Sequence, residues 1–370
     1  MGGFGCKVVE ASAGGMRKVE KKGTGKLAFI FPGQGSQSVG MGKALYDACP
    51  SAREVFDEAE SALGMDLKRL CFDGPEVELN LTENTQPALL AASVAALRVL
   101  EKEVPLFPDF VAGHSLGEYT ALVCAGVLKF QDALRLVRLR GRFMQESVPG
   151  GVGRQRGPQP ATQPVQQPAT QSATQSATQS VMMSAVIGLA PETLDEICKK
   201  ISAGKEQVVC ANINSPEQVV ISGTASAVSM AGEEAKKRGA KRVIPLPVSV
   251  PSHSPLMEGA AQKLYTELLK VPFGDLKVAL VTNVEAEPCK DPAKIKELLM
   301  RQLTSPVRWV DVIRRVRSEG VSITLEIGPG NVLSGLVRRI DKGIETLNFS
   351  APEDIHRIKD FFGFRLKVRP

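Results

Sequence analysis

One short segment of this 370-residue chain has the residue types and spacing of a catalytic nucleophile. Residues 113–117 read Gly-His-Ser-Leu-Gly, which fits the G-x-S-x-G pattern. The apolar run 110–112 predicts a strand before it, and residues 118–124 predict a helix after it. A tight turn there holds the Ser115 hydroxyl away from the backbone, and the helix N-terminus adds positive potential for an oxyanion. The pattern predicts a serine nucleophile; the alternative is a glycine-rich helix start capped by Ser115.

A serine hydroxyl needs a base within hydrogen-bond reach, and the chain has three histidines: His114, His253 and His356. Side chains that are neighbours on a sharp turn diverge, so His114 is a poor choice. His356 lies in a polar segment near the C-terminus, which indicates a solvated helix. His253 lies between Pro251 and Pro255, and two prolines stiffen a loop enough to hold an imidazole at a fixed angle. We therefore expect His253 to be the base.

The elements that would position these residues alternate between strand and helix. Apolar runs at 27–31 and 110–112 predict buried strands, and residues 85–102 predict a helix that is apolar on most faces and therefore buried. Apolar runs resume at 278–281 and 322–327. This alternation predicts a larger α/β-hydrolase-like domain built on a parallel sheet.

A smaller unit is predicted within residues 181–248. The expected order is β-α-β-β-α-β, the split βαβ order of a ferredoxin-like α+β domain, with elements at 182–189, 191–201, 207–214, 218–222, 225–238 and 241–245. We expect this small domain to interrupt the large one, which then comprises 26–150 and 249–350. Residues 351–370 would form a C-terminal helix or tail.

Two segments have compositions that do not suit a packed core. In the Gln/Thr/Pro/Ser-rich segment 154–180, Pro160–Gln163 recurs as Pro168–Gln171 and then twice with Ser in place of Pro. Without bulky apolar groups to offset ordering entropy, it is expected to be a disordered insertion; the alternative is a partner-binding or aggregation-prone segment. Residues 1–25 lack the apolar region of a secretory signal and are expected to be a disordered extension.

Composition excludes several classes of function. The net charge is 46 − 40 = +6 and aromatic residues are only 5%, which argues against a nucleic-acid partner. Seven cysteines without a CxxC pair do not indicate a zinc site or a disulfide scaffold. The most apolar stretch, Ala88–Leu100, is 13 residues long and contains Arg98, whereas a membrane span needs roughly 20. These features predict a soluble protein without a metal or membrane partner.

Seven segments together resemble one family: the malonyl-CoA:acyl carrier protein transacylases of fatty-acid synthesis, with the related acyltransferase domains of polyketide synthases. They occur in the family's order over roughly residues 27–340, apart from the insertion, and they are Phe31–Gln37, Asn84–Leu90, Gly113–Glu118, Arg140–Gln145, Val250–His253, Gln302–Trp309 and Glu326–Gly330. The resemblance implies ping-pong transfer of a malonyl group from malonyl-CoA to the phosphopantetheine thiol of acyl carrier protein, through a malonyl-serine intermediate.

The resemblance also implies catalytic roles. Ser115 would accept the acyl group and His253 would be its base, with no carboxylate to complete a triad. A main-chain carbonyl near Gln302 would orient the imidazole; taken alone, Gln302 reads as an ordinary helix-surface amide. Backbone N–H groups of Gln34 and Leu116 would form the oxyanion hole, and both lie on loops at strand C-termini, where α/β sheets place their sites.

Substrate binding is implied for two further residues, Arg140 and Gln86. A guanidinium offers a bidentate fork to the free carboxylate of a malonyl group. Taken alone, Arg140 is one of several arginines on an amphipathic helix and reads as part of a solvated face. Within the family, Leu116 after the serine and the small Ser252 before the histidine favour malonyl over methylmalonyl.

The expected partners are acyl carrier protein and a coenzyme A ester, bound by a monomer without a cofactor. A basic cluster on the small domain is either a docking patch for an acidic carrier or a solvated helix face, and it comprises Lys236, Lys237, Arg238, Lys241 and Arg242. We expect this bacterial-type enzyme to act in a bacterial cytoplasm or, because the extension and the insertion suggest a eukaryotic version, in a plastid-like or mitochondrial organelle.

Two other functions stay open. A serine hydrolase with the same strand-turn-helix would release free acid without a thiol acceptor and would not need Arg140. A catalytically idle scaffold would use the 154–180 segment to recruit partners. Long loops cost little free energy, so we expect the site to tolerate that insertion.

Overall fold

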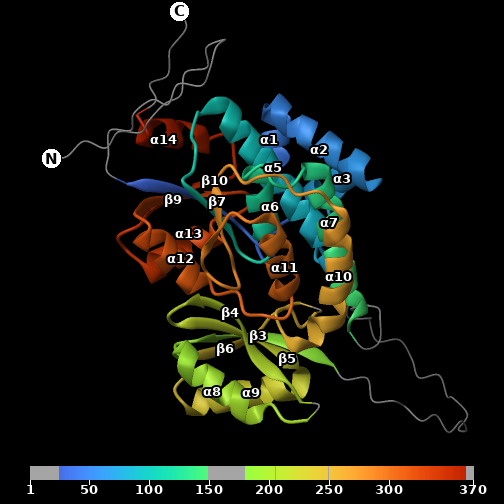
Figure 1. The fold of residues 1–370 in the computed structure, drawn as a ribbon, viewed down its shortest axis with the longest axis vertical. Helices are drawn as coiled ribbons and strands as arrows, with labels where there is room; N and C mark the ends of the chain where they lie inside the picture. Colours follow the sequence, from blue (N-terminus) through green and yellow to red (C-terminus); the bar gives the residue numbers. More distant parts are fainter. Residues whose placement is uncertain (1–24, 149–179, 205, 249, 364–370) are drawn as a thin grey trace, which may run out of the picture.

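A computed structural model of the chain describes residues 25–148, 180–204, 206–248 and 250–363 (Figure 1). Almost all of the expected N-terminal extension and of the 154–180 insertion therefore lies outside the described residues. The described residues form two sheets, and helices cover each of them. A six-stranded sheet forms the larger unit, and a four-stranded sheet lies at one end of the molecule.

The larger sheet has the strand order β10-β9-β1-β2-β7-β8. Its first five strands are parallel, and β8 pairs antiparallel with β7 at one edge. The strand bounds are β1 Lys26–Phe31, β2 Phe110–Gly113, β7 Ala279–Val281, β8 Pro288–Cys289, β9 Val321–Ile327 and β10 Glu345–Phe349. A parallel sheet is covered on both faces, which is why β1 and β2 are continuous apolar runs with almost every residue buried.

Helices on the two faces of this sheet enclose two separate apolar cores. The larger core gathers residues from α2, α5, α6, α7 and α10, and the smaller core gathers residues from α12 and α13. The helix bounds of this unit are α1 Lys43–Ala48, α2 Pro50–Leu63, α3 Leu67–Phe72, α4 Glu76–Leu79, α5 Thr82–Glu103, α6 Gly117–Cys124, α7 Phe130–Glu146, α10 Glu258–Lys270, α11 Pro292–Gln302, α12 Trp309–Ser318, α13 Val332–Ile340 and α14 Asp354–Phe361. The expected buried helix is α5, which begins three residues earlier than predicted.

The smaller sheet is antiparallel, with the order β4-β5-β3-β6. Its elements are β3 Val181–Ile187, α8 Pro191–Ile201, β4 Val208–Ser215, β5 Gln218–Thr224, α9 Ala225–Lys237 and β6 Arg242–Pro245. The apolar faces of α8 and α9 pack on one side of this sheet and close its core. Both parts of the expected fold class, a parallel α/β sheet and a ferredoxin-like α+β sheet, are confirmed.

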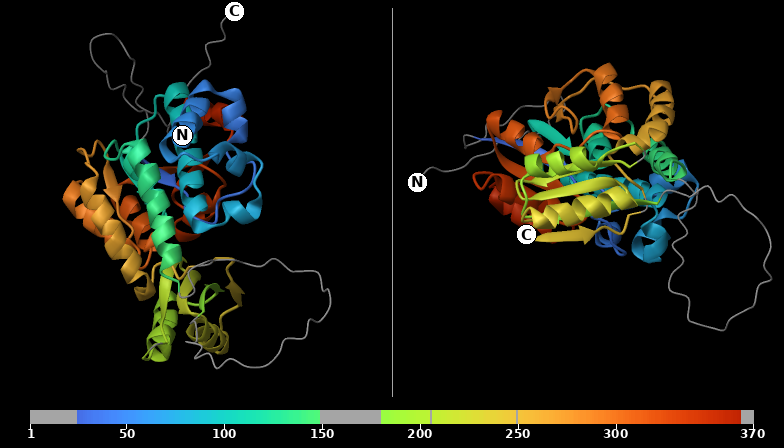
Figure 2. Two further views of the ribbon diagram at one scale, coloured as in Figure 1. Left: turned by 90° about the vertical axis from the view of Figure 1, so that its right-hand side faces the viewer. Right: turned by 90° about the horizontal axis from the view of Figure 1, so that it is seen from below.

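The two units contact each other through main-chain and side-chain groups. Ile213 of β4 donates its N–H to Val307, and Val307 donates to Ala211, each with N···O of 2.9 Å. In Figure 2 (left), the long helix α7 runs toward the small unit. The segment that follows Gln302 therefore reaches the small sheet, so residues from both units can line one site.

None of the helices in the described ranges is long and apolar enough to cross a membrane.

Candidate active site

Ser115 lies in the turn between β2 and α6, as the motif predicted, and its backbone has a φ of 50°. This left-handed conformation is rare for residues other than glycine. The turn is tight because Gly117 lies against β1: a Cβ at Gly117 would be 2.1 Å from the carbonyl oxygen of Phe31. A strained turn of this kind holds the Ser115 side chain outward, as a nucleophile elbow requires.

Asn283, which follows β7, holds this turn from the side. Its Oδ1 accepts the N–H of Ser115 at 2.7 Å, and its Nδ2 donates to the carbonyl of Gly113 at 2.7 Å. The two bonds bracket the strained residue and satisfy both backbone groups. A fully buried amide therefore stabilises the conformation of the turn.

His253 reaches Ser115 from the loop that precedes α10. Its Nε2 lies 2.8 Å from Ser115 Oγ, and its Nδ1 lies 2.7 Å from the main-chain oxygen of Gln302. A carbonyl oxygen can only accept, so Nδ1 carries the proton and Nε2 is free to accept the hydroxyl proton. This is the tautomer that a base for Ser115 needs.

The carbonyl that orients His253 is free because Gln302 is the last residue of helix α11. Carbonyls in the final turn of a helix lack an intrahelical partner and carry partial negative charge. The carbonyl at the end of α11 therefore orients the imidazole as a carboxylate does in a catalytic triad. It stabilises the imidazolium form less than a carboxylate would.

Arg140 of α7 is 1% exposed, which excludes the solvated-face interpretation of this arginine. Its Nη2 donates to Ser115 Oγ at 3.2 Å and to Gln302 Oε1 at 3.0 Å. The guanidinium also lies over the ring of Tyr119, 5.9 Å from the ring centroid. A buried cation beside the nucleophile can bind an acyl group that carries its own negative charge.

The Gln302 side chain is fully buried and is therefore not a surface amide. Its Nε2 donates to the carbonyl of Ser115 at 3.1 Å and to Oε2 of Glu118. The other carboxylate oxygen of Glu118 accepts the N–H of Asn283 at 3.3 Å. Glu118 and Asn283 are the residues of this network for which the sequence predicted no role.

Burial changes the protonation of the groups around Ser115. Loss of hydration, with the charge of Arg140 as a second cause, lowers the pKa of His253 to about 3, which keeps the imidazole neutral. Burial raises the pKa of Glu118 to about 7, although Gln302, Asn283 and Arg140 act in the opposite direction. Burial also lowers the pKa of Arg140, and the charge of Glu118 opposes that change.

Gln34 lies on the loop after β1, and Leu116 follows Ser115 in the turn before α6. A Cβ at Gly33 would be 2.2 Å from the His114 carbonyl, so the loop after β1 touches the turn. Within the described residues, neither the Gln34 N–H nor the Leu116 N–H has a hydrogen-bond partner. Both donors are therefore available to an oxyanion.

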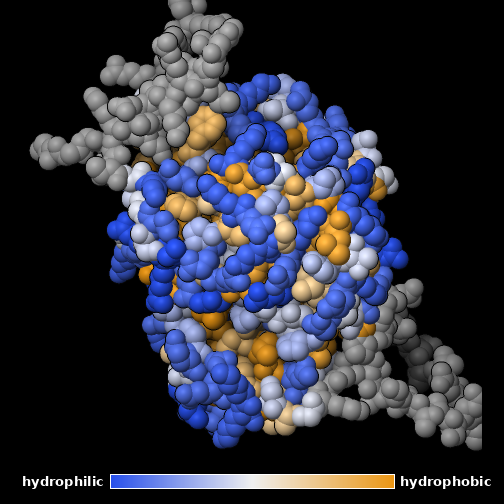
Figure 3. Space-filling model, in the orientation of Figure 1, coloured by the Kyte–Doolittle hydropathy of each residue, from blue (hydrophilic) through white to orange (hydrophobic). Residues whose placement is uncertain are grey.

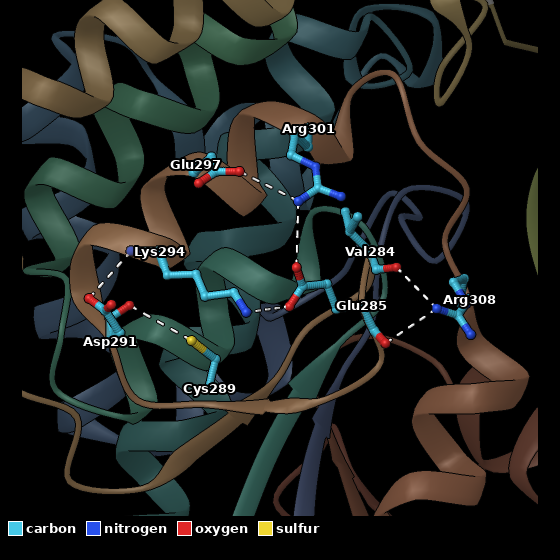
Figure 4. A network of polar contacts seen from close by, with 8 residues as sticks. All are labelled: Val284, Glu285, Cys289, Asp291, Lys294, Glu297, Arg301 and Arg308. Atoms are coloured by element: carbon cyan, nitrogen blue, oxygen red, sulfur yellow. Dashed lines mark hydrogen bonds and ion pairs between the residues drawn. The ribbon is translucent and has the colours of Figure 1, made fainter.

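An ion-pair network fixes the loop that carries Asn283 to the helix that carries Gln302 (Figure 4). Glu285 pairs with Lys294 at 2.6 Å and with Arg301 at 3.5 Å, both on α11. Arg308 donates to the carbonyls of Val284 and Glu285. Single partly exposed pairs of this kind stabilise little, but together they tie two segments that meet at Ser115.

His253 also lines a cavity of about 360 Å³ between the two units. Cys210 and Ile213 of β4 line one side, and Thr304 and Pro306 line the other. His114, which was rejected as a base, bonds Asn214 of β4 at 2.8 Å and thereby joins the turn to the small sheet. His253 and His114 thus both reach the junction of the two units.

Gln86 is the expected site residue that the structure does not bring into this network. It is fully buried, and its Nε2 donates to Met144 Sδ at 3.5 Å, one turn beyond Arg140 on α7. Its Oε1 has no partner within the described residues.

Two signals in the sequence could have drawn attention to the residues that were missed. Glu118 directly follows the serine motif, and Asn283 comes two residues after a buried strand, at the edge where parallel sheets gather functional groups. Neither signal specifies a role without the contacts of the folded chain.

The basic cluster on the small unit is largely paired with acidic neighbours at the surface. Lys236 pairs with Glu233 at 2.8 Å, and Lys237, Arg238 and Lys241 also have acidic partners within 4 Å. These contacts favour the solvated helix face over the docking patch. Among the described residues, no group of three or more His, Cys, Asp or Glu side chains is arranged to hold a metal ion.

Comparison with known sequences finds one consistent similarity. The family described as "Acyl transferase domain" matches residues 28–203 and 170–350. A malonyl CoA-acyl carrier protein transacylase of Bacillus subtilis (strain 168) is 46% identical over 330 residues, covering 89% of this chain and 95% of its own. The transacylase of Escherichia coli (strain K12) is 45% identical over 327 residues, covering 88% and 95%.

Solved structures show the same similarity. An acyl carrier protein S-malonyltransferase from Vibrio cholerae superposes with a TM-score of 0.80 at 42% identity, covering 90% of this chain and all of its own. A malonyl-transacylase solved in complex with its type II PKS acyl-carrier protein superposes with a TM-score of 0.81 at 42% identity, covering 91% and 99%.

Proposed function

This chain belongs to the malonyl-CoA:acyl carrier protein transacylases, and we propose that Ser115, His253 and Arg140 carry out its reaction. It is an acyltransferase of fatty-acid synthesis that moves a malonyl group from coenzyme A to acyl carrier protein. The observation that carries the assignment of residues is that Ser115 Oγ contacts both His253 Nε2, at 2.8 Å, and Arg140 Nη2, at 3.2 Å. Nucleophile, base and carboxylate-binding cation therefore meet at one oxygen.

In the first half-reaction, Ser115 attacks the thioester carbonyl of malonyl-CoA while its proton passes to His253 Nε2. The oxyanion forms beside the N–H groups of Gln34 and Leu116, and Arg140 binds the free carboxylate. When the intermediate collapses, the carbon–sulfur bond breaks and the imidazolium returns its proton to the departing thiolate of coenzyme A. The product is a malonyl ester of Ser115 and a neutral His253.

In the second half-reaction, the phosphopantetheine thiol of acyl carrier protein gives its proton to His253 and attacks the ester. The new carbon–sulfur bond forms, the Ser115 oxygen leaves, and His253 protonates it. The neutral resting state of His253 suits both steps, because the imidazole must accept a proton first in each. The cavity between the units is the proposed route for the phosphopantetheine arm.

We propose that Gln86 completes the substrate pocket, which is supported by its unpaired, buried Oε1. We also propose two domains, 26–150 with 249–350 and 181–248, separated by the 154–180 insertion and followed by the 351–370 tail. Among the described residues, the strands of the small sheet pair only with one another, apart from an isolated bridge between Asn212 and Val307, which supports that division.

We propose that the reaction needs no cofactor, because Ser115, His253 and Arg140 provide the nucleophile, the base and the carboxylate-binding cation. On the face shown in Figure 3, apolar residues are interspersed with hydrophilic ones. We propose that the chain acts as a monomer. The relatives named above are bacterial, so we propose action in a bacterial cytoplasm, with an organelle as the alternative. Fractionation of cells that express the full chain distinguishes the two.

Incubation with malonyl-CoA followed by intact-mass measurement tests the reaction. We expect one malonyl group on Ser115, which holo acyl carrier protein removes and which does not form on the Ser115→Ala variant. Rapid release of malonate without a thiol acceptor would indicate a hydrolase. No adduct on the folded wild-type chain would exclude the assignment of Ser115 as nucleophile.

A further inference from the structure

The Gln302 side chain separates the buried cation of the site from a buried acid. Arg140 Nη2 donates to Gln302 Oε1 at 3.0 Å, and Gln302 Nε2 donates to Glu118 Oε2. Within the described residues, Arg140 forms no ion pair with Glu118 or with any other acid, although each influences the protonation of the other. The amide thus lies between two groups that would otherwise attract each other directly.

The contacts of Glu118 are those of an ionised carboxylate. Each of its oxygens accepts from an N–H donor, Gln302 Nε2 on one side and the Asn283 backbone on the other. Its place in the first turn of α6 also favours negative charge. With Glu118 2% exposed and Arg140 1% exposed, water screens neither charge well.

This arrangement meets two opposing requirements for Arg140, namely a nearby negative charge and free access for the carboxylate of the substrate. A buried guanidinium without a counter-charge is costly, so the free enzyme needs an acid nearby. An acid bonded directly to the guanidinium, however, would have to be displaced by the carboxylate of the substrate. An amide between them lets the acid compensate the charge while the donors of Arg140 that face Ser115 stay available.

We propose that Glu118 is a positioning residue: acting through the Gln302 amide, its negative charge partly neutralises the charge of Arg140 without an ion pair between them. Glu118 thereby sets the affinity of the site for carboxylated acyl groups. This inference rests on the proposed function, because it assumes that Arg140 binds the malonyl carboxylate. It assigns to the Gln302 side chain a role separate from that of its main-chain carbonyl, which orients His253.

Two substitutions should change that affinity in opposite directions. Glu118→Gln removes the compensating charge while nearly keeping the shape, so an entering carboxylate meets a stronger cation. Gln302→Met removes the amide but keeps the main-chain carbonyl, so Glu118 can pair directly with Arg140 and compete with the substrate. A purely structural role for either residue would weaken all substrates alike and could not produce opposite signs.

The test is single-turnover acylation of Ser115 at pH 8 without a thiol acceptor. The acylated fraction of the protein is measured by intact-mass spectrometry. The half-saturating concentration is measured for malonyl-CoA, with uncharged acetyl-CoA as the reference. We expect Glu118→Gln to lower the half-saturating concentration of malonyl-CoA roughly tenfold relative to acetyl-CoA. Gln302→Met should raise it by a similar factor. An effect of this size is expected when one charge near Arg140 is removed or brought closer in a site that water screens poorly.

A matched control is Glu146→Gln, which removes an acid from the same helix as Arg140. Glu146 is at the surface and pairs with Arg142 and Lys263, so its loss should change neither value. Shifts in the same direction for both variants, or no shift relative to acetyl-CoA, overturn the proposal.

If Glu118→Gln does not fold, Gln302→Met decides alone: an unchanged or improved affinity for malonyl-CoA overturns the inference. Failure of the proposed function is a separate outcome, because wild-type chain would then form no malonyl adduct at all.

Discussion

Ser115 and His253 are 138 positions apart in the chain, yet their Oγ and Nε2 atoms lie 2.8 Å apart, and both residues have positive φ, 50° and 59°. Each such conformation costs about 1–3 kcal/mol in a residue other than glycine. Among the described non-glycine residues, only Ala286 shares this feature. The fold thus holds both partners in unfavourable backbone conformations, and surrounding contacts such as those of Asn283 must stabilise them.

Replacing Arg140 should reduce acylation by charged substrates more than acylation by uncharged ones. With Arg140→Ala, we expect acylation by malonyl-CoA to fall about a hundredfold or more, because the carboxylate would be buried without a partner. Acylation by acetyl-CoA should fall much less. Arg140→Lys should be intermediate, since an ammonium keeps the charge but lacks the planar fork.

The control for Arg140 is Arg142→Ala on the same helix, where the arginine is exposed and pairs with Glu146. It should leave both rates unchanged. Equal losses with the two substrates in Arg140→Ala would contradict a role in carboxylate binding.

In the Glu118→Gln variant, the acylation rate should be insensitive to pH over the range where an ordinary histidine titrates. Protonated His253 cannot accept the Ser115 proton, so the rate falls as the pH drops through the pKa of the folded state. That pKa is lowered from 6.5 to about 3, so the neutral imidazole should persist well below pH 6. Single-turnover rates in the Glu118→Gln background, which lacks the other group titrating nearby, measure this. A rate that falls to half its maximum near pH 6.5 would show that burial does not lower the pKa of His253.

Selectivity for malonyl over acetyl should depend on pH through Glu118. The pKa of Glu118 is raised to about 7, so its carboxylate gains a proton as the pH falls through that value. Compensation of Arg140 is then lost, and we expect the malonyl-to-acetyl ratio of acylation rates to rise between pH 8 and pH 6.

Other groups near Glu118 should not contribute over that range. Burial lowers the pKa values of His253 and His114 and raises that of Tyr119, so it disfavours the charged form of all three. The Glu118→Gln variant should therefore show a flat ratio. A ratio that rises equally in the variant would assign the effect to another group.

Two glycine-to-alanine substitutions should have opposite effects on stability. At Gly117, a Cβ would lie 2.1 Å from a main-chain oxygen of β1, which cannot move without disturbing the sheet. We expect a loss of about 1–3 kcal/mol or more in the free energy of unfolding. At Gly335, in α13, a Cβ would meet nothing within 4 Å, so alanine should be neutral or stabilise by up to about 1 kcal/mol.

Urea unfolding of the two variants, followed by far-UV circular dichroism, provides this comparison. A Gly117→Ala variant as stable as the wild type would mean that the Ser115 turn is less tightly packed against β1 than the structure indicates.

Local pattern in the sequence predicted much of what is observed. The buried strands, the buried helix α5 and the order of the small sheet follow from apolar periodicity, because each depends on residues close together in the chain. The serine turn was predictable for the same reason, since strand, turn and helix are contiguous. His253 was chosen from three histidines by its stiff loop, and the family resemblance supplied Gln302 and Arg140.

Only the tertiary structure decided how these residues meet. The parallel sheet brings the ends of β1, β2 and β7 to one edge, and there Asn283 reaches the Ser115 turn. The burial of Arg140, which its amphipathic helix did not indicate, depends on what packs against α7. The role of the Gln302 amide depends on Glu118, 184 positions away. Distances between such residues are set by the order of strands and the packing of helices, which no local pattern encodes.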